Sequence, residues 1–358
     1  MIKRKEVNYI NRISGLEVFD LENASHNVSL SSAEIANLWT QYINDSLSIC
    51  ILSHAVSKVN DEEIKEVIDQ AISMAKTHLV SITEFFNKED YPVPKGFTLD
   101  DDVNMNAPAL FTDKFLLVYM HVMTLHGMTG YSGAVGTSAR EDQIDYFTEC
   151  NYATMKLYKR ILDLMLKKGI YTRPPNIDIP NGVDMIDQQR YMAGWFAKKR
   201  PLTASEISGI SYNVQKTVVK ITLEIAFGQV CKSKPVQKFF LLGKDICEKH
   251  YSVFRDILQK SDLSTPPTLA SEVTDSITSP YSEKLMLNHI VLLVSASIGF
   301  YGAGLAVTQR RDIALDYTRL LAEIGLYANE GAQLLIENGW LEQPPLAHNR
   351  AELAKRKG

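Results

Sequence analysis

An internal repeat is the feature that most constrains the fold of this 358-residue chain. The string LSSAEI at residues 30–35 returns as LTASEI at residues 202–207, an offset of 172 residues. The pairs that continue the repeat are His78 with His250 and Pro94 with Pro266 at the same offset, then Lys114 with Lys284, Tyr131 with Tyr301, and Gly169 with Gly339 at an offset of 170. A single two-residue deletion explains both offsets, and it marks a loop because loops tolerate deletions best. The chain is therefore two copies of one structural unit.

Each unit begins with a helix-start signal. Ser31 is followed three residues later by Glu34, and Thr203 is followed by Glu206 in the same way. This is the capping-box pattern, in which two side chains satisfy free backbone amides of the first turn. Apolar residues at helical spacing predict a second helix over residues 62–87, followed by a very apolar third helix and an amphipathic fourth. Four helices per unit are therefore expected.

The connections between these helices predict their arrangement. The first-to-second and third-to-fourth connections are short, whereas the polar, proline-bearing segments 90–110 and 262–279 separate the second helix from the third. A helix of about 27 residues is roughly 40 Å long. About 20 extended residues reach up to about 66 Å, which is enough to run back along a whole bundle. One long crossover between helices B and C is the ferritin-like arrangement.

The sequence thus predicts an all-α fold of two tandem ferritin-like four-helix bundles, with a long B–C crossover in each. Each bundle is expected to close around its own apolar core. The expected division is an N-terminal extension at residues 1–29, bundle 1 at 30–175, an inter-bundle segment at 176–201, bundle 2 at 202–345 and a C-terminal tail at 346–358.

Residues 285–307, LMLNHIVLLVSASIGFYGAGLAV, are long and apolar enough to cross a bilayer, since about 20 such residues span its hydrocarbon core. The equivalent helix of unit one contains His121, His126 and four glycines, which make a poor membrane span. Two equivalent helices should share one environment, so we assign residues 285–307 to the innermost helix of a water-soluble bundle. Each helical glycine costs about 1 kcal/mol relative to alanine, and the glycines are expected where helices approach closely.

Charge and composition limit the partners. The net charge of −4 provides no basic surface for nucleic acid, which we exclude as a partner. The first 20 residues have no apolar run with a cleavage site, so no secretory signal is expected and the chain is predicted to be cytoplasmic. The four cysteines form neither a C-x-x-C pair nor a zinc-type spacing, and we interpret them as buried small side chains rather than disulfide partners.

A ferritin-like bundle raises the question of a di-iron site, which needs a Glu from each of two helices and a Glu-x-x-His pair from each of the other two. No Glu-x-x-His occurs in the sequence, helix C has no carboxylate in its central run, and helix D has no histidine. Phosphate-loop, dinucleotide-binding, G-x-S-x-G and H-E-x-x-H motifs are also absent. We therefore predict no metal, no cofactor and no catalytic residue.

Two recurrent histidines, His78 and His250, fall on the apolar stripe of the second helix in each unit. A buried imidazole must find hydrogen-bond partners. Asp45 in unit one and Glu224 in unit two lie on stripes from which either could face its histidine. The carboxylates do not recur between the units, so the repeat does not decide their role.

Two readings of these histidines stay open. One is a core histidine that is satisfied by a tyrosine, a threonine or the backbone. The other is a small-molecule or metal pocket, with His121 and His126 as further ligands in unit one.

Charged clusters mark the tight turn between helices C and D, with Arg140 and Asp142 in one unit and Arg310 and Asp312 in the other. We expect the arginine to hydrogen-bond the last carbonyls of helix C and the aspartate to stabilise the start of helix D. We prefer this capping role to anion binding.

The inter-bundle segment, residues 176–201, is too apolar for a flexible linker because it holds Met185, Ile186, Trp195 and Phe196. We expect it to form a short helix that packs in the groove between the bundles. The alternative is an exposed patch that is used for assembly.

Four strings carry a resemblance to a known family: KRPLTASEI at residues 199–207, VTDSITSPYSEKLMLNH at 273–289, YGAGLAVTQRRD at 301–312 and ENGWLEQPPLAHNR at 337–350. With them the chain resembles, over about residues 10–353, a family of tandem-repeat bundle proteins from Bacillus and related spore formers, known as a domain of unknown function. That family is similar to spore coat protein F and to ferritin-like bundles. The resemblance implies the fold and an association with spores, and it brings no catalytic residues.

The leading functional prediction is a non-enzymatic structural or packing protein that self-associates or binds spore-associated proteins. Its location is predicted to be cytoplasmic, with the spore association implied by the resemblance. The alternative is a small-molecule or metal-binding protein that uses the bundle cores around His78 and His250, with Asp45, Glu224 and His126 as further polar candidates. A membrane protein is the third class, and the assignment of the apolar stretch argues against it.

Overall fold

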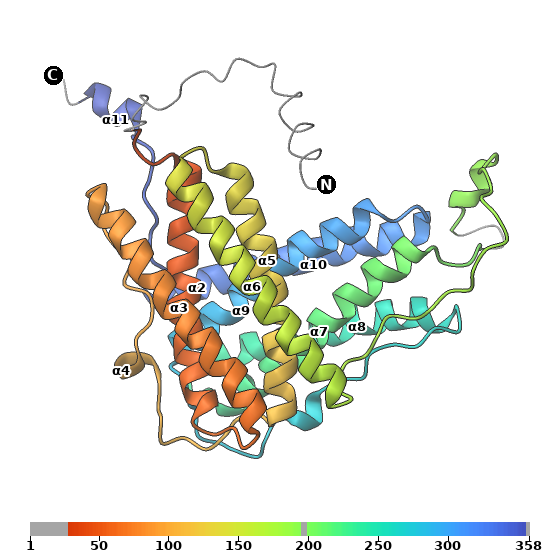
Figure 1. Ribbon diagram of the computed structural model, residues 1–358, viewed down its shortest axis with the longest axis horizontal. Coiled ribbons are helices and arrows are strands. Elements are labelled where there is room, and N and C mark those ends of the chain that lie inside the picture. Colours follow the sequence, from red (N-terminus) through yellow and green to blue (C-terminus); the bar gives the residue numbers. More distant parts are fainter. Residues whose placement is uncertain (1–27, 195–198, 356–358) are drawn as a thin grey trace, which may run out of the picture.

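The computed structural model describes residues 28–194 and 199–355, which form helices joined by loops. The all-α prediction is confirmed, and the four-helix unit occurs twice (Figure 1). The first unit consists of α2 (Ser32–Val56), α3 (Glu62–Lys88), α5 (Asp113–Thr137) and α6 (Glu141–Lys167), and the second of α7 (Ala204–Val230), α8 (Lys234–Gln259), α9 (Glu283–Ala306) and α10 (Arg311–Glu337). The short elements are α4 (Leu99–Asp102), η2 (Gln189–Met192), η3 (Ala270–Glu272) and α11 (Arg350–Lys355). Of the predicted N-terminal extension, residues 1–27 lie outside the described residues.

Both predicted capping boxes are present. The Ser31 hydroxyl accepts from the Glu34 amide at 3.3 Å, while Glu34 Oε2 accepts from the Ser31 amide at 2.7 Å. Thr203 and Glu206 make the same two bonds at 3.2 and 2.9 Å. The other oxygen of each glutamate accepts from two backbone amides at the turn between the third and fourth helices. Each glutamate therefore links the start of the first helix of its unit to the turn between the third and fourth helices.

The arginines at that turn have partners other than the predicted ones. Arg140 forms a two-pronged ion pair with Asp142, at 3.0 and 2.6 Å, and donates to the Val28 carbonyl at 3.1 Å. Arg310 forms the same pair with Asp312, at 3.1 and 2.7 Å. The prediction that these arginines bond the last carbonyls of the third helix is wrong, because a nearby carboxylate forms stronger charge-assisted bonds than a neutral carbonyl.

Each unit contains the long crossover that the sequence predicts. Residues 89–112 connect α3 to α5, and residues 260–282 connect α8 to α9. The two-residue deletion falls where α4 of the first crossover is replaced by the shorter η3 of the second. The deletion is in a connection, as expected.

The two crossovers pair with each other about a pseudo-twofold axis. Val103 forms an antiparallel bridge with Tyr281, and Phe111 forms one with Val273. The second bridge is the image of the first, because Val103 is equivalent to Val273 and Phe111 to Tyr281 under the 170-residue offset. One unit thus gives its partner the same contacts that it receives.

Side chains beside the bridges obey the same symmetry. The Thr112 hydroxyl donates to the Glu272 carboxylate at 2.6 Å, and its equivalent Ser282 donates to Asp102, the equivalent of Glu272, at 2.6 Å. Reciprocal contacts of this kind are typical of the interface of a symmetric dimer. Here both halves of the dimer belong to one chain.

The two units share one apolar core. Buried side chains of both units form a continuous cluster to which α5 contributes Phe115, α7 contributes Val218 and α9 contributes Leu285. The prediction of a separate core in each bundle is therefore wrong, because the paired crossovers bring α5, α7 and α9 together. A smaller cluster belongs to the first unit alone and consists of Leu30, Leu38, Ile82, Phe86, Ala134 and Phe147.

The apolar helix α9 is long and apolar enough to cross a membrane by length and composition. In the structure its first half is an interior helix, since residues 285–290 are all buried. It packs against α7 and α10 (Figure 1). Packing inside the bundle is what the comparison with its twin helix predicts.

The glycines of α5 and α9 do not all serve close packing. A Cβ atom added at Gly133 of α5, or at Gly299 or Gly302 of α9, would meet nothing within 4 Å. At Gly304, by contrast, it would lie 2.6 Å from the Tyr317 hydroxyl. The prediction of close helix approach is confirmed at Gly304 and is wrong at these three positions, and also at Gly130 and Gly136.

The segment between the units projects from the second bundle at the right of Figure 1. Residues 173–188 form neither helix nor strand, and Ile179 and Val183 are each 94% exposed. The prediction of a packed helix is wrong for these residues, because three prolines and a glycine interrupt the segment. Trp195 and Phe196, on which that prediction also rested, lie outside the described residues.

Candidate functional site

His78 lies inside the first unit and is hydrogen-bonded to Asp45. Helix α3 carries the histidine and α2 carries the aspartate, and His78 Nδ1 lies 3.1 Å from Asp45 Oδ2. Their exposed fractions are 8% and 9%. The structure therefore brings together two residues that the sequence placed on apolar stripes of neighbouring helices.

Side chains from α2, α5 and α6 surround this pair. The rings of Tyr131 and Tyr146 meet the imidazole edge-on, with centroids 5.9 and 6.3 Å away. The Tyr146 hydroxyl donates to Gln41 Oε1 at 3.1 Å, and Gln41 Nε2 lies 3.8 Å from Cys150 Sγ. The result is a closed hydrogen-bonded set within the bundle.

This environment keeps His78 charged. Burial disfavours the imidazolium, but hydrogen bonds with Asp45 and Cys150 outweigh burial and raise the pKa of His78 to about 10. Burial raises the pKa of Asp45, against the effect of the bond from His78. Because the two groups are in direct contact, we assign the imidazolium–carboxylate pair as the form at neutral pH.

A thiol beside a histidine that a carboxylate orients is also the arrangement of a cysteine nucleophile. Cys150 is 3% exposed, however, and it does not line the cavity between the two units. The His78 set therefore lies buried in the bundle, where it pairs a charged imidazole with a carboxylate.

His250, the equivalent histidine of the second unit, has different partners. Its Nδ1 lies 3.1 Å from the Tyr301 hydroxyl and its Nε2 lies 3.2 Å from Glu323 Oε2. Burial, together with the nearby Lys220, lowers the pKa of His250 to about 4 in spite of Glu323. The two recurrent histidines therefore differ in charge at neutral pH. The repeat gave no signal for Glu323, since the first unit has alanine at that position.

Glu224 meets other residues, and the prediction that it faces His250 is wrong. Its Oε1 accepts from the Tyr327 hydroxyl at 3.4 Å, beside Gly243 of α8. Its Oε2 has no hydrogen-bond partner within the described part of the chain. Burial raises the pKa of Glu224 to about 8, so this carboxyl is protonated at neutral pH. Glu224 lies at the level of Gly243 along the bundle, where the missing side chain of the glycine leaves room for the Tyr327 hydroxyl.

His121 and His126 lie on α5 but face different neighbours. The His121 ring lies between Tyr158 and Tyr171, with centroids 5.2 and 5.5 Å away. The His126 ring packs on Phe300 of the second unit at 5.0 Å. Both Nε2 atoms are buried without a partner among the described residues, and burial lowers the two pKa values to about 4 and about 3. Neither histidine joins the pair formed by α2 and α3.

Lys216 of α7 is a polar core residue that sequence reasoning missed. Its Nζ lies 3.4 and 3.5 Å from the ring centroids of Tyr212 and Phe300. Burial lowers the pKa of Lys216 to about 6. The two rings hold the lysine by cation–π attraction when it is charged. The available signal was the position of Lys216 between the apolar residues Val214 and Val218 on α7.

No group of three His, Cys, Asp or Glu side chains is placed to hold a metal ion in residues 28–194 and 199–355. The four cysteines are buried and unpaired, as the sequence predicts.

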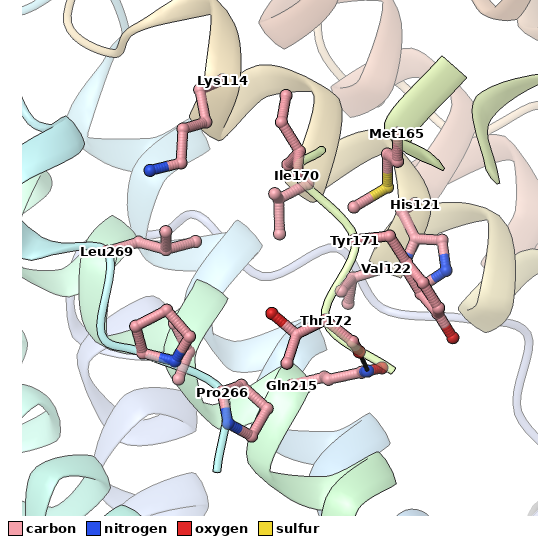
Figure 2. Close-up of a pocket in the computed structure, with 13 residues that line it drawn as sticks. Lys114, His121, Val122, Met165, Ile170, Tyr171, Thr172, Gln215, Pro266 and Leu269 are labelled. Carbon is pink, nitrogen blue, oxygen red and sulfur yellow. Dashed lines mark hydrogen bonds between the residues drawn. The ribbon is translucent and has the colours of Figure 1, made fainter. Parts of the chain in front are cut away.

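A cavity of about 70 Å³ opens between the two units. Figure 2 shows side chains of α5, of the segment after α6, of α7 and of the second crossover converging on it. Polar groups come from Lys114, His121, Thr172 and Gln215, whose Nε2 donates to the Thr172 carbonyl at 3.3 Å. The main apolar walls are Val118, Val122, Met165, Ile170, Pro266 and Leu269. Sequence reasoning missed this site because its lining comes from four distant segments.

The family to which the chain is similar matches it twice, in agreement with the repeat. A family model described as a protein of unknown function, DUF3231, matches residues 19–183 and again residues 190–353. No curated protein matches the chain. Among solved structures, a "putative spore coat protein" from Bacillus halodurans C-125 is 22% identical, covers 43% of this chain and 99% of its own, and superposes with a TM-score of 0.39. Because the two family matches span most of the sequence, the chain belongs to the DUF3231 family and contains its unit twice.

Proposed function

We propose that the protein is a non-enzymatic structural protein that assembles through two helical faces, one on α5 and one on its equivalent helix, α9. The observation that carries this proposal is the set of helical glycines that face open space: Gly130, Gly133 and Gly136 on α5, and Gly299 and Gly302 on α9. We call the two surfaces the α5 glycine face and the α9 glycine face.

These glycines have a cost that the single chain does not explain. Each destabilises its helix by about 1 kcal/mol relative to alanine. At Gly133 and Gly302 no side chain or backbone of the same chain is close enough to exclude a Cβ atom. A helix of another copy that packs closely on the face would leave no room for a Cβ atom, because small residues let helix backbones approach.

The pseudo-twofold arrangement makes each chain divalent. The crossovers fuse the two units through reciprocal bridges, and one core runs through both. The α5 and α9 glycine faces lie on equivalent helices, but their glycines are one position out of register, since Gly299 and Gly302 correspond to Thr129 and Ser132. Every copy therefore presents two glycine-bearing surfaces on one block. When like faces pair, divalent blocks add one after another instead of stopping at a dimer.

The polar cores support a structural role over the alternative of a ligand site around His78 and His250. Both histidines are buried, and Nδ1 of His78 and both ring nitrogens of His250 are hydrogen-bonded to neighbouring side chains of the same unit. The association with spores stays a prediction from the family resemblance. Fractionation of spores and vegetative cells with an antibody against the chain would test it.

The test of assembly replaces one glycine on each face by leucine. Light scattering after size-exclusion chromatography should show wild-type species larger than a dimer that grow with concentration. Gly133→Leu or Gly302→Leu alone should stop growth at the dimer, and the double variant should be monomeric.

Gly325→Leu is the matched control, since Gly325 is also helical and faces open space but lies on α10. This control should assemble like the wild type. A wild-type chain that stays monomeric at every concentration, or a Gly325→Leu variant that fails to assemble in the same way, would contradict the proposal.

A further inference from the structure

The cavity between the units has a twin position on the other side of the pseudo-twofold axis, and the two differ in ways that point to a ligand. We propose that the cavity lined by His121 and Leu269 is a binding site for a small neutral alcohol or phenol, whose hydroxyl pairs with His121 Nε2. The twin position serves as an internal reference, because the same fold has closed it with larger side chains and extra hydrogen bonds.

At the twin position the first crossover is clamped onto the bundle. Glu342 accepts from the backbone amides of Lys95 and Gly96 at 2.8 and 2.7 Å. The Lys284 ammonium donates to the Gly96 carbonyl at 2.9 Å and lies 4.6 Å from the ring centroid of Phe97. The crossover is thereby held against α9 and the segment that follows α10.

The residues that make this clamp are missing at the cavity. Glu342 is replaced by Thr172, and Lys95 is replaced by Pro267, which has no backbone N–H to donate. The equivalent of Lys284, Lys114, pairs with Glu272 at 2.8 Å instead of closing over the crossover.

At two positions the cavity is lined by smaller side chains than its twin. Leu269 stands where the twin has Phe97, and Ile170 stands where it has Trp340. Two aromatic rings are thus exchanged for aliphatic groups around one space, while Tyr171 stands where the twin has Leu341. The smaller side chains and the loss of the clamp both leave space unfilled in the cavity.

His121 supplies the polar contact that an empty apolar gap would not need. It is 3% exposed, it lines the cavity, and its Nε2 has no partner among the described residues. A buried polar atom of this kind costs free energy until a partner satisfies it. The twin has Val291 at this position, so the histidine belongs to the open site alone.

The chemistry of the lining selects the ligand class. His121 is neutral at neutral pH because burial and the nearby Lys216 lower its pKa to about 4. A neutral imidazole nitrogen either donates or accepts, and a hydroxyl can match it in both cases. The remaining walls, which include Met165, Pro266 and Leu269, favour a compact apolar body. A space of about 70 Å³ admits a molecule the size of several waters, on the scale of one small ring.

The experiment uses the full chain, with phenol as the probe and toluene as its hydroxyl-free counterpart. Binding is measured by calorimetric titration and by NMR shifts of the Met165 methyl and the His121 ring. The wild type should bind phenol saturably and more tightly than toluene. Every test substitution installs the twin's own residue.

His121→Val should weaken phenol binding about fivefold, the value of one buried neutral hydrogen bond, and leave toluene binding unchanged. Leu269→Phe should abolish binding of both probes. Phe97→Leu, on the clamped side, is the matched control and should bind phenol like the wild type. Circular dichroism and thermal unfolding of each variant establish that it is folded.

Three results would overturn the proposal. They are the lack of saturable phenol binding, equal affinity for phenol and toluene in the wild type, and phenol binding that survives Leu269→Phe in a folded protein.

Discussion

Tyr119 and His289 occupy the same position in the two units and are hydrogen-bonded to each other, with the Tyr119 hydroxyl 3.2 Å from His289 Nε2. A pair of equivalent residues in mutual contact lies on the pseudo-twofold axis. Burial raises the pKa of Tyr119 and lowers the pKa of His289 to about 3, so both groups are neutral at neutral pH. The bond joins α5 to α9 at the centre of the shared core.

Removing this hydroxyl should weaken both units at once. Tyr119→Phe leaves the buried His289 without its partner, and the free energy of unfolding should fall by about 1–3 kcal/mol. Denaturant titration measures the change. Trp39 reports on the first unit and Trp340 on the second, each in a variant that lacks the other tryptophans.

The shared core predicts that both tryptophans report one transition. Tyr152→Phe, at a tyrosine that is 54% exposed, is the control and should leave stability unchanged. Two well-separated transitions would show that the units unfold independently and that the axis contact is unimportant.

The twin histidines should respond to pH in opposite directions. The folded-state pKa of His78 is about 10, above its ordinary value of 6.5, so its stabilisation is fully present below pH 6.5 and is lost as pH rises toward 10. The folded-state pKa of His250 is about 4, so its contribution is present above pH 6.5 and is lost as pH falls toward 4.

NMR titration of the imidazole signals measures both pKa values directly. The difference in free energy of unfolding between wild type and His78→Asn should become smaller as the pH rises toward 10. The corresponding difference for His250→Asn should become smaller as the pH falls toward 4. A His78 ring that loses its proton near pH 6.5 would refute the ion-paired assignment.

The sequence was a good guide to local structure. Ser31 with Glu34 and Thr203 with Glu206 announce helix starts, because a capping box is complete within four residues. The repeat then transfers each assignment from one unit to the other. Helix order and the long crossovers could be predicted for this reason.

Contacts between the units could not be predicted in the same way. A repeat shows which residues are equivalent, but not that equivalents such as Tyr119 and His289 touch. The partner of His250 was missed because Glu323 has no counterpart in the first unit, and the repeat was the main signal. The Asp45–His78 contact could be anticipated because both residues lie on neighbouring helices joined by a short turn.

Two glycine-to-alanine substitutions should have opposite effects. Gly133→Ala places a methyl group in open space, so the isolated chain should gain about 0.5–1 kcal/mol from helix propensity. Gly331→Ala places its Cβ 2.6 Å from Val291 Cγ2 and 2.8 Å from Phe239 Cζ, and should cost about 1–3 kcal/mol by overpacking. Thermal unfolding of dilute, monomeric protein measures both, and a loss of stability in Gly133→Ala would mean that its face is already packed.

Glu206 is the residue whose charge most directly holds the second bundle closed. It is buried, and its two oxygens accept from the Arg200 guanidinium at 2.8 Å and from the amides of Thr203 and Arg310. Burial opposes its charge, but these bonds prevail and lower the pKa of Glu206 to about 2. Glu34, its twin, accepts from the same kinds of amides, but position 28 is Val28 instead of an arginine.

Glu206→Gln should therefore lower the free energy of unfolding by roughly 3 kcal/mol at neutral pH, because it leaves Arg200 without its buried counter-charge. Glu34→Gln is the matched comparison. It should lower the free energy of unfolding by less, because Val28 stands at the position equivalent to Arg200 and no ion pair is broken there. The folded-state pKa lies below the ordinary 4.5, so the stabilisation is present above pH 4.5 and is lost as pH falls toward 2. Denaturant titrations should accordingly show the wild type and Glu206→Gln converging in acid. If the difference in free energy of unfolding between wild type and Glu206→Gln stayed constant down to pH 2, the glutamate would act through its shape and not through its charge.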